Sequence, residues 1–158
     1  MGEIELQQLL QELRNCKTLF VGIGSEIRGD ELGIKRIIEN LSKTKNINMG
    51  ALWADTRPEN FLKYIEKYNP EKLIFLQASK FGGSAGDTRV LYIDEHDEDT
   101  LHESPITTMA HYLDETIGTK SILVVVEPKY LKIGGMSDEM KKAADRISTI
   151  ILDYIQRC

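Results

Sequence analysis

The sequence predicts a three-layer α/β domain, in which a mostly parallel sheet of five strands, one of them antiparallel, lies between helices on both faces. Two observations predict this class. Apolar runs of strand length alternate with segments whose apolar residues recur at helical spacing. In addition, the glycine-rich connection over 78–87 is too short for the crossover helix that parallel neighbours need. We therefore expect the strands on either side of it to pair antiparallel with each other.

The first half of the chain alternates between helices and strands. Leucines at 6, 9, 10 and 13 predict a helix over 3–14, and the apolar run 18–23 predicts a buried strand. Apolar residues at 34, 37, 38 and 41 predict the next helix, and 47–53 the second strand. Pro58 suits the first turn of a following helix, which carries apolar residues at 61, 62 and 65.

The second half completes the sheet. Strands are predicted over 72–77 and 88–93, followed by an acidic loop over 94–103 and a helix near 107–117. The apolar run 122–126 predicts a strand at the centre of the sheet. Ser137 is predicted to cap a last helix after the glycines at 134 and 135. The apolar face of that helix consists of Met140, Ala143, Ala144, Ile147, Ile151 and Tyr154.

Composition excludes several classes of function. The 158 residues suit one domain, 1–158, in which 1–16 form an additional N-terminal helix. A net charge of −5 without a basic cluster argues against nucleic-acid binding, and no apolar run is long enough to span a membrane. Cys16 and Cys158 show no metal-binding spacing, and the N-terminus lacks the layout of a signal peptide. We therefore expect a cytoplasmic location.

The loop after the first strand is the most informative segment of the chain. It contains Gly24 and Gly29 and ends in the acidic pair Asp30 and Glu31, where a helix begins. Ile27 stands where a dinucleotide fingerprint needs glycine, and a phosphate-binding loop would carry Gly-Lys-Ser/Thr in place of Gly-Asp-Glu. Adjacent carboxylates would instead attract a cation. The alternative is that they only stabilise the N-terminus of the helix through its macrodipole.

Four loops are expected to meet at one edge of the sheet. In sheets of this kind, sites gather at the carboxyl ends of the strands. Those ends are 24–31, 55–59, 77–80 and 127–128. Pro58 and Glu59 therefore belong to the same rim as Gly24 and Gly29.

From about residue 17 onward, the chain resembles the hydrogenase maturation proteases, which are endopeptidases that trim the large subunits of [NiFe]-hydrogenases. The resemblance rests on the order and spacing of several short motifs. They are the 24–33 loop, Pro58-Glu59-Asn60, Leu76-Gln77-Ala78, Ser84-Ala85-Gly86-Asp87, Glu127-Pro128 and Met136-Ser137.

The resemblance implies a site and a substrate. In that family an acidic residue of the first loop, an aspartate that ends the third strand and a histidine that opens a later helix hold a metal. These groups recognise nickel already present in the large-subunit precursor, the partner, before its C-terminal extension is removed. Carried over to this chain, the first ligand is Glu31, with Asp30 beside it as a second catalytic candidate. Gln77 and Met109 occupy the positions of the aspartate and the histidine.

The replaced ligands leave two hypotheses open. A carboxylate, an amide and a thioether bind Ni²⁺ or Zn²⁺ more weakly than two carboxylates and an imidazole. His111 could replace the histidine only if its helix starts late, because two residues correspond to about 200° of helix rotation. His96 and His102 lie in the acidic loop, a run of a kind that is usually solvated and in which weak adventitious metal binding would be unsurprising. The chain is either an endopeptidase with a rearranged site or a non-catalytic binding module. An unrelated nucleotide-binding protein is a third alternative, disfavoured by the loop.

Overall fold

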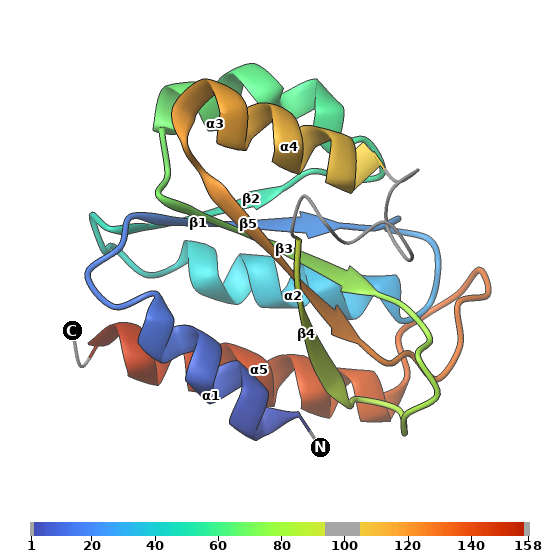
Figure 1. The fold of residues 1–158 in the computed structure, drawn as a ribbon. Coiled ribbons are helices and arrows are strands. Elements are labelled where there is room, and N and C mark those ends of the chain that lie inside the picture. Colours follow the sequence, from blue (N-terminus) through green and yellow to red (C-terminus); the bar gives the residue numbers. More distant parts are fainter. Residues whose placement is uncertain (1, 94–104, 157–158) are drawn as a thin grey trace.

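The computed structural model describes residues 2–93 and 105–156, which form a five-stranded sheet between two layers of helices (Figure 1). The strand order is β2-β1-β3-β5-β4, and every pair of neighbours is parallel except β4 and β5. The three-layer α/β prediction is confirmed. The strands are β1 Thr18–Ile23, β2 Met49–Trp53, β3 Lys72–Ala78, β4 Thr88–Tyr92 and β5 Lys120–Val126. The acidic loop expected over 94–103, with His96 and His102, lies outside the described residues.

The helices follow the predicted order. The first helix, α1, spans Glu3–Glu12, and α2 spans Glu31–Ser42. A 3₁₀ helix at Pro58–Phe61, which begins at the expected proline, runs into α3 Leu62–Tyr68. The last two are α4 Pro105–Ile117 and α5 Asp138–Gln156. In the described part of the chain, no helix is long and apolar enough to cross a membrane.

Two apolar clusters hold the layers together, one on each face of the sheet. Alternate residues of a strand point to opposite faces, so Ile74 and Leu76 pack with α1, α2 and α5, while Leu73 and Phe75 pack with α3 and α4. Figure 1 shows these two sets of helices below and above the sheet. All six residues of β1 are buried, as expected for a strand covered on both faces.

The antiparallel strand lies beside a different partner from the one expected. Thr88–Tyr92 is antiparallel, but the predicted pairing of 72–77 with 88–93 is wrong, because β5 lies between β3 and β4. The connection over 79–87 passes the end of β5 and bonds to it. Ser79 N donates to Val126 O at 3.1 Å, and Gly86 N donates to Glu127 O at 2.8 Å. A strand that comes much later in the sequence thus separates two strands that a short loop joins.

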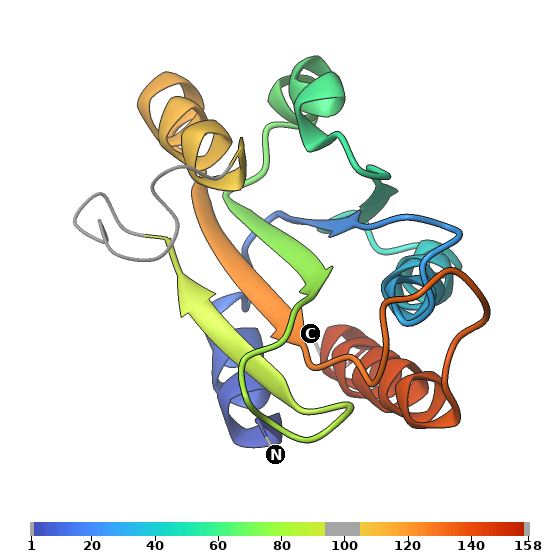
Figure 2. The ribbon, with the colours of Figure 1, turned by 90° about the vertical axis from the view of Figure 1, so that its right-hand side faces the viewer.

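The N-terminal helix covers an edge of the sheet. Strand β4 is an edge strand, and such strands present unpaired backbone groups. Helix α1 lies along β4 and α5 (Figure 2), and Val90 N donates to the Glu5 carboxylate at 3.0 Å. Glu3 of α1 also pairs with Arg146 of α5 at 2.9 Å. The helix therefore protects the antiparallel edge and lies away from the start of α2.

Candidate functional site

The expected rim is present at the carboxyl ends of the parallel strands. Gly24, directly after β1, donates its N–H to Asp55 O at 3.0 Å and so joins the first two loops. Within the second loop Pro58 is buried and Glu59 is exposed. The loop that follows β5 bonds in turn to the loop between β3 and β4. Four separate stretches of chain thus meet at one edge, close to the beginning of α2.

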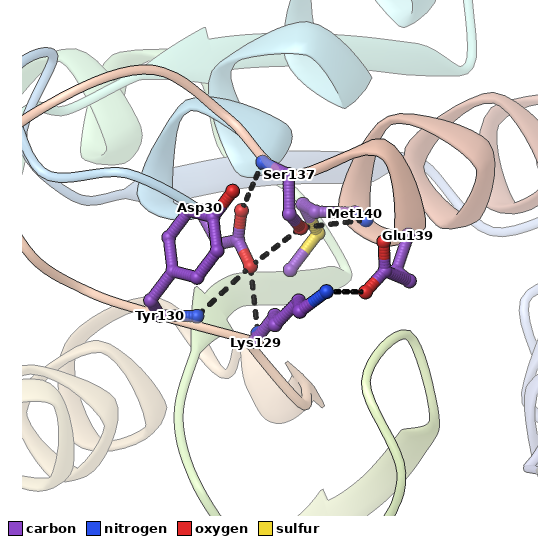
Figure 3. A network of polar contacts seen from close by, with 6 residues as sticks. All are labelled: Asp30, Lys129, Tyr130, Ser137, Glu139 and Met140. Carbon is purple, nitrogen blue, oxygen red and sulfur yellow. Dashed lines mark hydrogen bonds and ion pairs between the residues drawn. The ribbon is translucent and has the colours of Figure 1, made fainter.

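Asp30 is a buried carboxylate at the centre of this edge (Figure 3). Its side chain is fully buried and accepts four hydrogen bonds from the loop between β5 and α5. Oδ2 accepts from Lys129 N at 2.6 Å, from Tyr130 N at 3.3 Å and from Ser137 Oγ at 2.9 Å. Oδ1 accepts from Ser137 N at 2.7 Å. Asp30 therefore holds the 129–137 loop against the start of α2.

Two helix N-termini stabilise this buried charge. Asp30 immediately precedes α2 and makes no side-chain cap to that helix. Its partner Ser137 caps α5 as predicted, because Met140 N donates to Ser137 Oγ at 3.1 Å. The carboxylate thus lies near the positive ends of both helix dipoles and is surrounded by donors. The macrodipole alternative describes part of its role, and the bonds to the 129–137 loop describe the rest.

Glu31 is the residue of the acidic pair that solvent can reach. Its side chain is 16% exposed, and Oε1 accepts a hydrogen bond from Ser25 N at 3.1 Å. Oε2 lies 3.7 Å from Arg28 Nε, so the two side chains form a long ion pair. A Cβ on Gly24 would lie 3.1 Å from Glu31 Cβ and 3.3 Å from Oε1, so glycine allows the carboxylate to approach the loop backbone.

The backbone conformation at position 29 requires glycine. Its φ is +44°, and a Cβ there would lie 2.7 Å from Tyr130 O. Its N–H donates to Gly134 O at 3.2 Å. The first loop and the 129–137 loop therefore share a close backbone contact that a larger residue at 29 would disrupt.

Gln77 and Met109 are both on the α4 side of the sheet. Gln77 is half-buried and pairs in register with Ile23 of β1, next to Gly24. Met109 is only 5% exposed and packs in the cluster between α4 and the strands. Its thioether belongs to the core, so it is not available to an ion at the rim.

His111 faces a different part of the molecule. It lines a cavity of about 470 Å³ together with Tyr92, Lys72 and Lys120. These neighbours lie at the amino ends of β3 and β5 and at the carboxyl end of the antiparallel β4. These strand ends are on the opposite side of the sheet from the rim. The geometry therefore does not favour the hypothesis that His111 replaces the histidine ligand at the rim.

The donor set does not fit a metal ion bound to this chain. Of Glu31, Gln77 and Met109, one offers a charged oxygen, one a neutral amide and one a buried thioether. Across residues 2–93 and 105–156, no three His, Cys, Asp or Glu side chains are placed to hold a metal. A tightly bound Ni²⁺ or Zn²⁺ needs several charged or imidazole donors at one point.

Sequence reasoning overlooked the structural role of Glu127. This carboxylate is 5% exposed, and its Oε1 accepts from Phe81 N and Gly83 N, each at 2.9 Å. It holds the 79–87 loop as Asp30 holds the 129–137 loop. No local signal predicts this, because the donors lie 44 and 46 residues away in the sequence.

Comparison with known proteins identifies the family. The sequence model of the hydrogenase maturation proteases matches residues 34–154, about three quarters of the chain. The chain belongs to the hydrogenase maturation protease family.

Relatives with solved structures share the fold of this family member. The crystal structure of the [NiFe] hydrogenase maturation protease HycI from Thermococcus kodakarensis matches it with a TM-score of 0.84 at 22% identity, over 94% of this chain and 99% of that one. The hydrogenase maturating endopeptidase HybD from Escherichia coli matches with a TM-score of 0.70 at 20% identity, over 89% and 93% of the two chains.

A sequence relative gives the same assignment. A provisionally named hydrogenase maturation protease of Methanocaldococcus jannaschii is 26% identical over 161 residues, which cover 95% of each chain. As a member of the hydrogenase maturation protease family, the chain is connected with nickel through the hydrogenases on which the family acts. The match to the family model begins three residues after Glu31 and does not include the 24–33 loop.

Proposed function

We propose that this chain processes a [NiFe]-hydrogenase large-subunit precursor by removing its C-terminal extension, and that Glu31 is the acidic residue of its site. Family membership supports the type of reaction. The observation that carries the proposal is the position of Glu31, a partly exposed carboxylate at the rim, held by Ser25 N and approached by Gly24. Among the described residues Cys16 is a free thiol, which agrees with a cytoplasmic location.

The two acidic residues have different tasks in this proposal. Glu31 presents Oε2 to the nickel centre that the precursor brings with it, so nickel is part of the substrate. Oε1 is already engaged by Ser25 N, which fixes the direction of the carboxylate. Asp30 has no exposed surface and acts as a positioning residue that orders the loops around Glu31. With a single charged donor, the chain depends on the precursor for the remaining ligands of the nickel.

A second candidate function is binding without cleavage. The observation that favours it is the donor set, because Met109 is buried and Gln77 is uncharged. A chain with this rim could still recognise the precursor and hold it during assembly. The two candidates agree on the partner and differ in whether a peptide bond is broken.

One experiment separates them. The purified nickel-loaded precursor is incubated with the chain, and its intact mass and its binding to the chain are measured. Loss of the mass of the C-terminal extension establishes the endopeptidase. A stable complex with an unchanged mass establishes the binding module. Neither binding nor a change in mass would contradict both proposals.

A further inference from the structure

Three large apolar side chains are exposed beside the candidate site. Ile27 is 61% exposed, Tyr130 41% and Ile133 81%. They come from the first loop and the loop after β5, and two basic residues, Arg28 and Lys132, lie among them in the sequence and are exposed. We refer to these five residues as the rim surface. Exposed apolar side chains that gather in one place are typical of an interaction site.

The rim surface is held in a fixed arrangement. Gly134 N donates to Ile27 O at 3.0 Å, and Asp30 N donates to Tyr130 O at 3.1 Å. Arg28 and Gly134 form a parallel β-bridge. The Asp30 carboxylate in turn accepts from Tyr130 N. Because these bonds order both loops, little conformational entropy would be lost when a partner binds.

One part of the rim surface is hollowed, and another part lies beside Glu31. Tyr130, Lys132 and Ile133 line a shallow cavity of about 450 Å³ with the glycines at 134 and 135 and with Met136. Added Cβ atoms on either glycine would meet only open space. Arg28, at the other end, lies 3.7 Å from the Glu31 carboxylate. A chain segment bound along this surface would therefore lead toward Glu31.

The charge of the rim surface differs from that of the whole chain. The chain has a net charge of −5, yet this surface carries Arg28 and Lys132. Two nearby acidic residues are paired with other cations, since Glu26 pairs with Lys35 at 2.8 Å and Glu139 with Lys129 at 2.6 Å. None of the ion pairs between described residues involves Lys132. Basic and apolar side chains together complement a partner that carries acidic and apolar ones.

We propose that the rim surface binds the C-terminal extension of the precursor as an extended segment with apolar and acidic side chains. This inference rests on the proposed function, because it names where that partner is held. Ile27 and Ile133 provide the apolar contacts. Arg28 and Lys132 attract the acidic groups. Because Arg28 lies beside Glu31, a segment bound along the rim surface reaches Glu31.

The test compares paired serine substitutions. We measure the affinity of the purified precursor for the natural chain, for the Ile27→Ser/Ile133→Ser variant and for Ile47→Ser. Ile47 is a matched control, because it is 91% exposed and precedes β2 at the opposite edge of the sheet. We expect the double variant to bind about tenfold more weakly or worse, from the loss of two apolar contacts. The Ile47→Ser variant should bind as the natural chain does.

A second probe identifies the bound segment. The same large subunit, truncated before its extension, should bind the natural chain and the double variant equally. Equal binding of the full precursor by both chains would overturn the inference while leaving the proposed function intact. An equal loss for the truncated subunit would also overturn it, because the surface would then contact the mature part. If the natural chain itself bound no precursor, the proposed function would fail together with the inference.

Self-association is the remaining outcome. The molecular mass of the natural chain and of the double variant in solution is measured by sedimentation. A natural dimer that becomes a monomer in the double variant, without a change in precursor affinity, would assign the rim surface to a second copy and overturn the proposal. Equal masses, with weaker binding of the full precursor only, support it.

Discussion

At the scale of single residues, the acidic pair at the start of α2 divides into two different environments. Asp30 is fully buried and accepts four hydrogen bonds, while the Glu31 side chain is 16% exposed. The pair is adjacent in sequence, but only the structure reveals the difference. The donors to Asp30 lie 99 to 107 residues further along the chain, so no local pattern could have predicted them.

Removal of the Asp30 carboxylate should destabilise the fold. In Asp30→Ala, three backbone N–H groups and the Ser137 hydroxyl lose their acceptor, so we expect the free energy of unfolding to fall by about 3 kcal/mol or more. Urea denaturation measures this change. The control is Glu39→Ala, whose side chain is 62% exposed on the same helix and should change stability by less than about 0.5 kcal/mol. A similarly small effect of Asp30→Ala would contradict the positioning role.

Variants of Met109 test whether its side chain is part of the apolar core or a metal ligand. Because it is packed between α4 and the sheet, Met109→Ala should lower the free energy of unfolding by about 2–5 kcal/mol. Met109→Leu keeps the volume and should cost less than about 1.5 kcal/mol. Calorimetric titration with Ni²⁺ should give the same result for Met109→Leu as for the natural chain. A clear loss of nickel affinity in Met109→Leu would show that the thioether is a ligand.

At the scale of elements, an ion pair fastens α2 to α5, the two helices that begin at the site. Arg36 donates to both oxygens of Asp145, at 2.7 and 3.1 Å. The hydrogen bond from Arg36 holds the pKa of Asp145 below its ordinary value. A lowered folded-state pKa contributes stability above the unfolded pKa of about 3.9, and this contribution is lost as the pH falls through the folded value.

The lowered pKa of Asp145 predicts that the difference in stability between the natural chain and Asp145→Asn depends on pH. Asp145→Asn should be slightly less stable than the natural chain at pH 7, since both side chains are partly exposed and the pair is screened by solvent. As the pH falls from about 4 through the lowered pKa of folded Asp145, the difference should shrink, because the unfolded chain takes up the proton first and the folded carboxyl only below its own pKa. Thermal unfolding across this pH range measures it. A difference that grows as the pH falls would contradict the assignment.

Element by element, prediction succeeds where periodicity is strong. The helix expected over 3–14 is present as Glu3–Glu12, and Ser137 caps α5 as expected. The prediction of the strand beside β4 was wrong, because β4 pairs with β5, which lies some 30 residues further along the sequence. A short connection favours an antiparallel direction, and it does not determine which strand becomes the neighbour.

At the scale of the whole molecule, buried carboxylates build the rim. Asp30 orders the 129–137 loop and Glu127 orders the 79–87 loop, each by accepting backbone N–H groups. The convergence of the loops follows from parallel strands and could be predicted. The identity of the groups that fasten them could not, because each bond joins distant parts of the chain. Glu31 is thereby presented at a rim that other residues have ordered.

The most direct measurement is the processing of the nickel-loaded precursor by Glu31→Gln, followed as the loss of the extension in intact mass. Glutamine keeps the shape and removes the charge, so we expect no processing beyond background while the variant remains folded. Glu39→Gln, on the exposed part of α2, should process the precursor at the natural rate. Processing by Glu31→Gln at the natural rate would contradict the account, because the carboxylate assigned to the nickel centre would then be dispensable.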